Sequence, residues 1–210
     1  MKRLKLGLAV ATVLSGLGQT AQAACPADGA TPFTAAAVNQ QNGFASYVQD
    51  SQGLALELCL DPAFCFFAPP IDGNQFSQQI GFGAEAFWWL SEATVTTSRG
   101  LNALVVMAAE AAFAFEVPTD GEQFPFTRLR LRLDVPLPGI YTVIHPYGQE
   151  RFIVEAVGAG DEIRESFDIE FMPNAVNRGR VAPWLTWDTY NNPDDPTIPN
   201  FPIPGGGTTD

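Results

Sequence analysis

The sequence predicts an all-β protein: an antiparallel β-sandwich of the jelly-roll or immunoglobulin-like kind, in one domain with an extended Pro/Gly-rich C-terminal tail. Three observations support this prediction. Apolar residues alternate with polar ones at period two in several segments, which is typical of half-buried antiparallel strands. Short clusters of Gly, Pro, Asp and Asn separate these segments, as turns do. With 46% apolar residues and sixteen phenylalanines, the chain can fill a sizeable core.

The clearest alternation lies in three segments, at residues 54–60, 128–135 and 166–171. Further strands are expected at residues 85–97, 102–117, 139–145, 150–157 and 181–187. The alanine-rich stretch within 102–117 has helical propensity, but its valines, its phenylalanines and its β neighbours favour a strand. Residues Thr34 to Gln41 are expected to form a short helix that Thr34 caps and that stops near Gly43.

The first 23 residues have the layout of a signal peptide. A basic start with Lys2, Arg3 and Lys5 precedes an apolar run of about a dozen residues, which is too short for a membrane span of ~20 residues. The sequence Ala21-Gln22-Ala23 then fits signal-peptidase cleavage. We therefore expect a mature protein that starts at Ala24, has no transmembrane segment, and is secreted or periplasmic. A lipoprotein anchored at Cys25 is the alternative, although Gln22 stands where a lipoprotein signal has leucine.

Export changes the charge balance. Removal of the signal peptide leaves eight basic residues, all arginine, against 23 acidic ones, a net charge of −15. Such a surface repels nucleic acid and anionic membranes, so nucleic-acid binding is not expected.

The mature chain is predicted to form one domain at residues 24–190 and a tail at 191–210. In the tail, proline recurs every third residue, which places these rings on one edge of a polyproline II rod. The tail is either a disordered terminus or a segment that docks on a neighbouring subunit or a cell-surface partner.

The three cysteines suggest one disulfide. In an oxidising compartment Cys59 and Cys65 are the expected partners, because Asp61-Pro62 favours a turn between them. Cys25 is then left free, lipidated or bonded to another chain. With a single histidine and no C-x-x-C pair, no protein metal site is expected from Cys and His.

His145 and Tyr147 lie in the sequence His-Pro-Tyr-Gly, where a strand enters a turn. One histidine makes a Ser-His-Asp triad only if a serine and an acid converge on it from elsewhere, and the chain has no G-x-S-x-G motif. We expect a turn histidine bonded to backbone, with a binding role as the alternative.

Arg128, Arg130 and Arg132 share one face of one strand and could bind an anionic polysaccharide. The acidic strand with Asp168 and Glu170 could instead lie across from them, facing Arg130 and Arg132. We favour this structural charge ladder, because cross-strand pairs of opposite charge are common in sheets.

Aromatic residues suggest sugar binding as another possibility. Successive rings of Phe87-Trp88-Trp89 point to opposite faces of a strand, so at least one is expected to be exposed. Trp184 and Trp187 cluster before the tail, and exposed tryptophans stack on sugar rings. Buried core tryptophans are the more common alternative.

Glu92 and Glu110 stand inside the two most apolar strands. If 85–97 and 102–117 form a hairpin with its turn near Gly100 and Leu101, the two carboxylates lie almost opposite each other. They would then raise each other's pKa, or be held by an arginine such as Arg128 or by Ca²⁺, the only cofactor that the sequence suggests.

Several motifs occur together: EAAFA at 110–114, RxRxR at 128–132, YxVxHPYG at 141–148 and WLTWD at 184–188. In these motifs the chain resembles a group of uncharacterised secreted bacterial β-rich proteins over roughly residues 43–190. The resemblance implies export and a β-rich domain, and it brings no activity. Several members of that group carry a further cysteine pair after the acidic strand, which this chain lacks.

The sequence thus favours a secreted surface, matrix or assembly protein that acts by interaction, through self-association or a cell-surface polysaccharide or protein. A carbohydrate-binding module is the alternative, and a carboxylate-dependent glycoside hydrolase is the second alternative, so catalysis is not the expected role.

Overall fold

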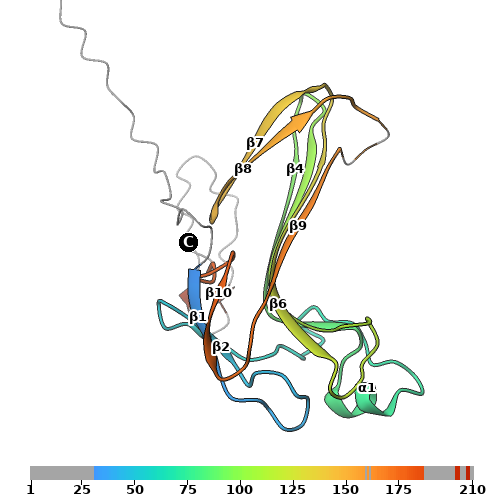
Figure 1. Ribbon diagram of the computed structural model, residues 1–210, viewed down its shortest axis with the longest axis vertical. Coiled ribbons are helices and arrows are strands. Elements are labelled where there is room, and N and C mark those ends of the chain that lie inside the picture. The colour runs from blue at the N-terminus through green and yellow to red at the C-terminus, as the bar shows by residue number, and fades with distance from the viewer. Residues whose placement is uncertain (1–30, 159, 161, 187–201, 204–206, 209–210) are drawn as a thin grey trace, which may run out of the picture.

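The computed structural model of the protein describes residues 31–158, 160, 162–186, 202–203 and 207–208. The fold is all-β, as the period-two alternation predicted, with antiparallel sheets and one short helix among the described residues (Figure 1). In chain order the elements are β1 (Thr31–Ala35), β2 (Val48–Asp50), β3 (Ala55–Leu56), α1 (Gln75–Ile80), β4 (Glu85–Thr96), β5 (Asn102–Phe113), β6 (Gln123–Asp134), β7 (Gly139–His145), β8 (Gly148–Val154), β9 (Ile163–Glu170), β10 (Ala175–Gly179), β11 (Pro202–Ile203) and β12 (Gly207–Thr208).

The largest sheet has the order β4-β5-β6-β9, and three of its strands have twelve residues each. We call it the long sheet. A smaller sheet has the order β10-β1-β2-β3, and β7 pairs with β8 in a separate hairpin. In Figure 1 this hairpin leaves one end of the long sheet and returns toward β1 and β10, while α1 lies at the opposite end.

The alternation in β6 shows why these segments are strands. Leu129, Leu131 and Leu133 are buried, while Arg128, Arg130 and Arg132 between them are partly exposed on the other face. Period two therefore gives the long sheet one apolar face that packs into the core and one face that carries charges. The alanine-rich stretch, β5, is a strand as predicted, and its small side chains leave room for larger ones on β4 and β6.

The core is rich in aromatic rings where the long sheet meets the small one. Phe33 of β1 contacts the ring of Phe171 at a centroid distance of 5.1 Å, and Phe171 contacts Trp88 at 5.4 Å. Phe44 links this group to Phe113 at 5.4 Å. These contacts join both sheets into one hydrophobic cluster, to which Val154 and Tyr147 of the β7–β8 region also belong.

A β-bulge interrupts β4 at Trp88. Phe87 lies opposite Glu110 and Trp89 lies opposite Ala109, so Trp88 has no partner of its own on β5. The extra residue turns Trp88 and Trp89 toward the same face, and both are buried. Phe87 is also buried, on the other face, against Phe66. The expectation that at least one of these three rings is exposed was therefore wrong.

The segment 59–68 covers the beginning of β4. Cys59 and Cys65 form the predicted disulfide, with their Cα atoms 5.5 Å apart. The Cys59 amide donates to the carbonyl of Phe87 at 3.1 Å, and the Ala68 amide donates to the carbonyl of Glu85 at 2.9 Å. The disulfide loop is thus attached to the edge of the long sheet.

The helix predicted at Thr34 to Gln41 does not form. Thr34 and Ala35 belong to β1, which lies between β2 and β10 and buries Phe33 and Ala35 at period two. Pairing on both sides and burial of these residues outweigh the helical propensity of the alanines that follow. Asn39 instead begins a turn, in which its carbonyl accepts from the amide of Gly43 at 2.8 Å.

The helix α1 was not predicted, although the sequence holds its signals. The side chain of Asn74 caps it by accepting from the Ser77 amide at 2.9 Å, and Gly81 ends it in the left-handed conformation at φ 87°. With only six residues, α1 lacks the long apolar period that reveals a helix.

Two predicted strands are shorter or absent. Residues 54–60 contain only the two-residue strand β3, because Leu58 and Leu60 pack into the core without a partner strand. Residues 181–186 form no strand, since Val181, Ala182 and Trp184 are all buried and no face of this stretch is exposed at period two. The expected tail and Cys25 lie outside the described residues, except for β11 and β12.

Candidate functional site

The residues singled out in the sequence fall into two places in the structure. The charged face of the long sheet carries Glu92, Glu110, Arg128, Arg130 and Arg132. The turn end of the β7–β8 hairpin carries His145 and Tyr147, and Tyr147 belongs to the same hydrophobic cluster as Trp184. Trp187 lies outside the described residues.

Four charged residues form a row across the long sheet, and we call them the charged row: Glu85, Glu110, Arg128 and Asp168. The Arg128 guanidinium makes two hydrogen bonds to the Asp168 carboxylate, both at 2.9 Å. Its Nη1 also donates to Oε2 of Glu110 at 3.0 Å. The structure thus pairs Glu110 with Arg128, the arginine that the sequence suggested.

Glu85, rather than Glu92, is the second carboxylate beside Glu110. Glu85 lies opposite Ala112, so its side chain is the diagonal neighbour of Glu110 on the same face, and the two side chains share a hydrogen bond. Burial is the largest cause that raises the pKa of Glu110 to about 8, and the Arg128 charge opposes this shift. Glu110 therefore holds a proton at neutral pH, which lets two acids share the site.

The expected opposition of Glu92 and Glu110 was wrong. Glu92 lies opposite Val106, four positions from Glu110 along β5, and its side chain is exposed. The β4–β5 turn is centred closer to Arg99 than to Leu101, because the Thr97 amide bonds to the Leu101 carbonyl. Each residue of shift in the turn moves the opposing partner by two positions.

The expected charge ladder was only partly right. Arg128 faces Asp168, but Arg130 lies opposite Ser166 and Arg132 lies opposite Arg164. Glu170, expected opposite an arginine, faces Phe126 instead. Burial, followed by the charges of Arg128 and Arg132, lowers the pKa of Arg130. Of the three arginines, only Arg128 therefore lies opposite a carboxylate of β9.

Three residues at the turn end of the hairpin form a second polar group, which we call the hairpin cluster: His145, Glu150 and Arg180. Glu150 and Arg180 are an ion pair, and Oε1 of Glu150 lies 4.0 Å from Nε2 of His145. Arg180 also lies over the ring of Phe167 at 4.3 Å, which connects β8 to β9. The cluster thus joins three parts of the chain.

His145 is bonded to backbone, as expected for a turn histidine. Its Nδ1 accepts from the Tyr147 amide at 3.3 Å, and its Nε2 is buried without a hydrogen-bond partner among the described residues. Burial is the largest cause that lowers the pKa of His145; the Arg180 charge adds to it and the Glu150 charge opposes it. The imidazole is therefore neutral at pH 7.

Tyr147 and Trp184 are core residues. The Tyr147 hydroxyl donates to the carbonyl of Pro183 at 2.7 Å, and burial raises its pKa. The Trp184 amide donates to Oδ2 of Asp50 at 2.9 Å, while its ring packs against Trp89 at 5.7 Å. Neither ring is available for stacking on a sugar.

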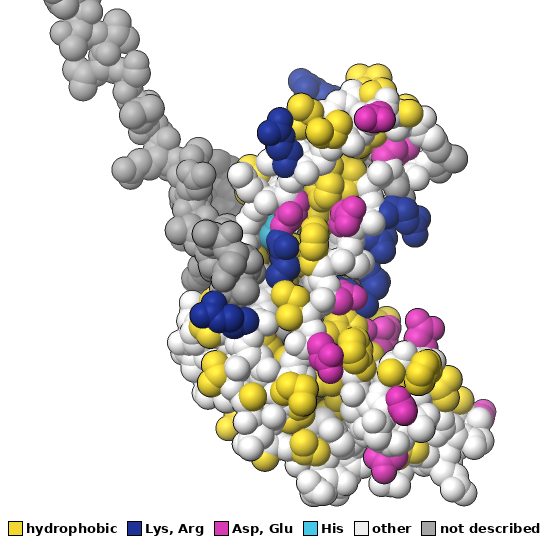
Figure 2. All heavy atoms as spheres, viewed as in Figure 1, with side chains coloured by type: hydrophobic (Ala, Val, Ile, Leu, Met, Phe, Trp, Pro, Cys, Tyr) yellow, Lys and Arg dark blue, Asp and Glu magenta, His cyan; other side chains and the backbone are white. Residues whose placement is uncertain are grey.

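An exposed apolar surface was missed in the sequence. The outer face of the β7–β8 hairpin presents Ile140, Ile144 and Ile153, which are 58%, 80% and 74% exposed. We call these three residues the isoleucine face. Figure 2 shows apolar side chains at the surface of the end where this hairpin lies. The sequence holds a signal for this surface. Within residues 140–144 the side chains on both faces of the strand are apolar except for Thr142, so one apolar face is left outside the core.

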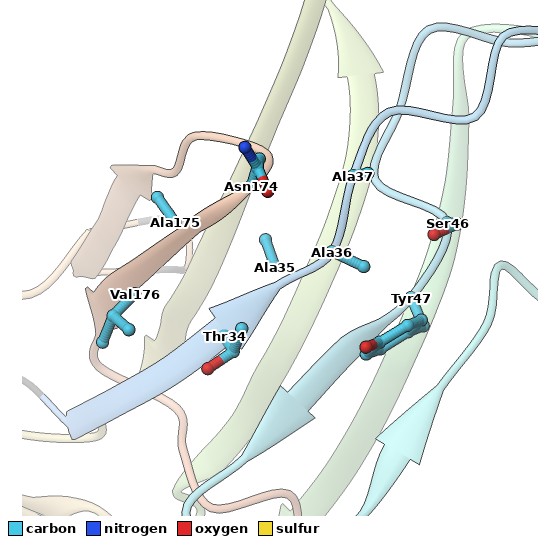
Figure 3. A pocket seen from close by; sticks show the side chains of 9 residues that line it. All are labelled: Thr34, Ala35, Ala36, Ala37, Ser46, Tyr47, Asn174, Ala175 and Val176. Carbon is cyan, nitrogen blue, oxygen red and sulfur yellow. The ribbon is translucent and has the colours of Figure 1, made fainter.

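A shallow depression of about 430 Å³ lies beside β1, between β2 and β10. Small side chains, Ala35 to Ala37, form its floor, with Thr34, Tyr47 and Asn174 around it (Figure 3). The Tyr47 side chain is partly exposed, so one aromatic face and several polar groups are accessible here.

Within the described part of the chain, no group of three or more His, Cys, Asp or Glu side chains is placed to hold a metal ion. No described helix has the length and apolar character needed to cross a membrane. No protein-family model, no curated protein and no solved structure matches this chain.

Proposed function

We propose that the protein is an exported structural or interaction protein, a cell-surface, matrix or assembly subunit that acts by binding rather than by catalysis. In this proposal residues 1–23 are a signal peptide, residues 24–190 form one β-sandwich domain, and residues 191–210 are a Pro/Gly-rich tail. The Cys59–Cys65 disulfide supports export, because such bonds persist mainly in oxidising compartments.

The isoleucine face is the observation that carries the proposal. Ile140 lies directly opposite Ile153, and Ile144 lies on the same face nearer the turn. Full burial of an isoleucine side chain stabilises by roughly 1.5–3 kcal/mol, so covering this face favours association. Arg151, opposite Thr142, is the one charged residue on this face of the two strands. A partner that covers the face is thus apolar with an acceptor near its centre.

The polar groups of the protein favour binding over hydrolysis. Glycoside hydrolysis requires two carboxyl groups that reach a bound sugar from opposite sides. Glu110 is 2% exposed and is held between Arg128 and Glu85, so its partners are within the protein. His145 is similarly enclosed by the hairpin cluster.

Two matched variants test the proposal. Ile153→Asp and Met172→Asp each place an acid at an exposed position, 74% and 62% exposed, the first on the isoleucine face and the second between β9 and β10. We expect the native exported protein and the Met172 variant to co-purify with the same partners, and the Ile153 variant to lose them. Equal retention by both variants, with melting temperatures unchanged, would contradict the proposal.

The depression beside β1 favours carbohydrate binding as a second candidate function. A tyrosine face next to hydroxyl and amide groups is a common arrangement for sugar recognition. A glycan array with the mature protein and with Tyr47→Ala tests it. Binding that depends on Tyr47 would support this second function, and an array without signal would exclude the glycans tested.

A further inference from the structure

β4 lies at one edge of the long sheet, and its two halves are covered differently. Beside the first half lies the segment 59–68, which bonds to the carbonyls of Glu85 and Phe87. Beside the second half, from Leu90 to Thr96, no strand lies among the residues that the structure describes. We call residues 90–96 the free edge.

Backbone groups point outward from the free edge at every second residue. The carbonyl of Phe87 faces away from β5, and the bulge at Trp88 shifts this alternation by one residue. Along an antiparallel strand the amide and carbonyl of alternate residues face the same neighbour. The outward-facing residues are therefore Leu90, Glu92, Thr94 and Thr96. An incoming strand finds a continuous row of donors and acceptors there.

The side chains of the two edges of the long sheet differ in charge. After Glu92, the free edge continues with uncharged residues, Ala93 to Thr97, all of them exposed. The opposite edge, β9, carries four charged side chains: Arg164, Glu165, Asp168 and Glu170. Charged side chains on an edge strand prevent pairing with another chain, so β9 is protected and the free edge of β4 is not.

We infer that the free edge pairs with the free edge of a second copy of this chain, antiparallel and across a twofold axis at Thr94. The inference deepens the proposed function and rests on it, since it names one partner of an interaction protein. The pairing would join two four-stranded sheets into one continuous sheet.

A second copy fits because a twofold axis brings the same surface of both copies together, and this surface is self-complementary. With Thr94 on the axis, Glu92 lies opposite Thr96 of the partner subunit. The two Glu92 carboxylates are then four strand positions apart, roughly 13 Å. No like charges face each other directly in this register, and the segment 59–68 ends the pairing at the same point in both copies.

The dimer is expected to be weak and to depend on salt. Pairing of seven-residue strands buries less surface than the roughly 1,600 Å² of a standard stable interface. Two mature chains of net charge −15 also repel each other, and salt screens this repulsion within about 8 Å at physiological ionic strength. Higher salt therefore strengthens the association.

Sedimentation equilibrium of the mature protein, from about 1 μM to 1 mM, tests the inference. We expect a reversible dimer in the native protein. Thr94→Lys places two like charges on the axis and is expected to weaken dimerisation by about 100-fold. Ser166→Lys makes the same kind of change on the same face at the β9 edge, and it should dimerise like the native protein. A monomer throughout, or equal dimerisation of both variants, would overturn the inference.

A cysteine variant tests the register independently of the lysine variant. Residues that face each other in a hydrogen-bonded antiparallel pair have Cα atoms about 5.5 Å apart, which suits a disulfide. In a Cys25→Ser background, Thr94→Cys should form a covalent dimer on mild oxidation, and Ser166→Cys should not. Equal cross-linking of the two variants would refute the twofold axis at Thr94.

The outcomes separate the inference from the proposed function. Ile153→Asp changes the isoleucine face and should leave dimerisation through the free edge intact. If the protein is monomeric but Ile153→Asp still abolishes partner binding, the inference is wrong and the proposed function stands. If dimerisation is confirmed and no variant alters partner binding, the interaction role of the hairpin is wrong.

Discussion

The charged row and the hairpin cluster solve opposite problems of charge balance. The charged row places three acids, Glu85, Glu110 and Asp168, around a single arginine. The hairpin cluster places one acid, Glu150, between Arg180 and His145. The first group has an excess of potential negative charge and the second an excess of potential positive charge.

In each group the most buried titratable side chain stays neutral. Glu110 keeps its proton because burial raises its pKa to about 8, and His145 remains unprotonated because burial lowers its pKa. Desolvation disfavours the charged form in both cases, so it acts in opposite directions on an acid and a base. The two groups should therefore respond to pH with opposite signs.

Loss of Arg128 should have the largest effect on stability. Arg128→Met leaves the buried Glu110 carboxyl and the Asp168 carboxylate without their shared hydrogen-bond donor, which should cost about 1–3 kcal/mol of the free energy of unfolding. Denaturant titration measures this. Arg130→Met is the matched control, because Arg130 makes only a 3.4 Å hydrogen bond to Ser166, and it should cost less than about 1 kcal/mol. Equal losses would show that Arg128 has no special role.

The pH dependence of Glu110 should have the next largest effect. Its folded pKa is raised, so its contribution to stability is full below the unfolded pKa of 4.5 and is lost as pH rises to about 8. Glu110→Gln should remove this decline between pH 4.5 and 8, as measured by melting temperature against pH. Glu92→Gln, an exposed acid on β4, should leave the decline unchanged. A decline that persists in Glu110→Gln would show that another group causes it.

The smallest effect is expected in the hairpin cluster. The pKa of His145 is lowered in the folded state. The folded protein therefore loses stability as pH falls below 6.5, the ordinary pKa of histidine, because the unfolded chain takes up the proton more readily. Arg180→Met should raise the pKa of His145 and reduce this loss of stability. The substitution removes a positive charge, while the negative charge of Glu150 continues to favour the protonated imidazole. Titration of the imidazole signals of the single histidine by NMR measures the shift. Arg151→Met, on the outer face of the hairpin, should not move it, and a lower pKa in Arg180→Met would contradict this account.

Alternation in the sequence predicted faces but not registers. It gave the β strands, the buried leucines of β6 and the arginines on the opposite face. It also suggested Arg128 as the partner of Glu110, and Asp61-Pro62 indicated the disulfide. Period two is local, and the side chains themselves reveal it.

Register depends on turns between the strands and on bulges within them. The bulge at Trp88 and the exact centre of the β4–β5 turn decide that Glu85, and not Glu92, joins Glu110. β6 and β9 are separated in the chain by the whole β7–β8 hairpin, so no short turn fixes which acid meets which arginine. Asp168 therefore faces Arg128, and not Arg130 or Arg132 as expected. The helix at Thr34 failed for a related reason, because β10, one of the two strands that pair with this segment, comes from a distant part of the chain.

The bulge in β4 also decides how one strand packs against two other parts of the protein. Side chains on one face of a regular strand are about 6.6–6.8 Å apart, so a regular strand cannot turn two successive rings the same way. With one inserted residue, Trp88 reaches Phe44 and Phe171 beneath the small sheet, while Trp89 reaches Tyr147 and Trp184 at the turn end of the hairpin. One inserted residue in β4 thus places two successive tryptophans in the core. Its deletion would restore regular pairing with β5 and turn one of the two rings toward the charged face.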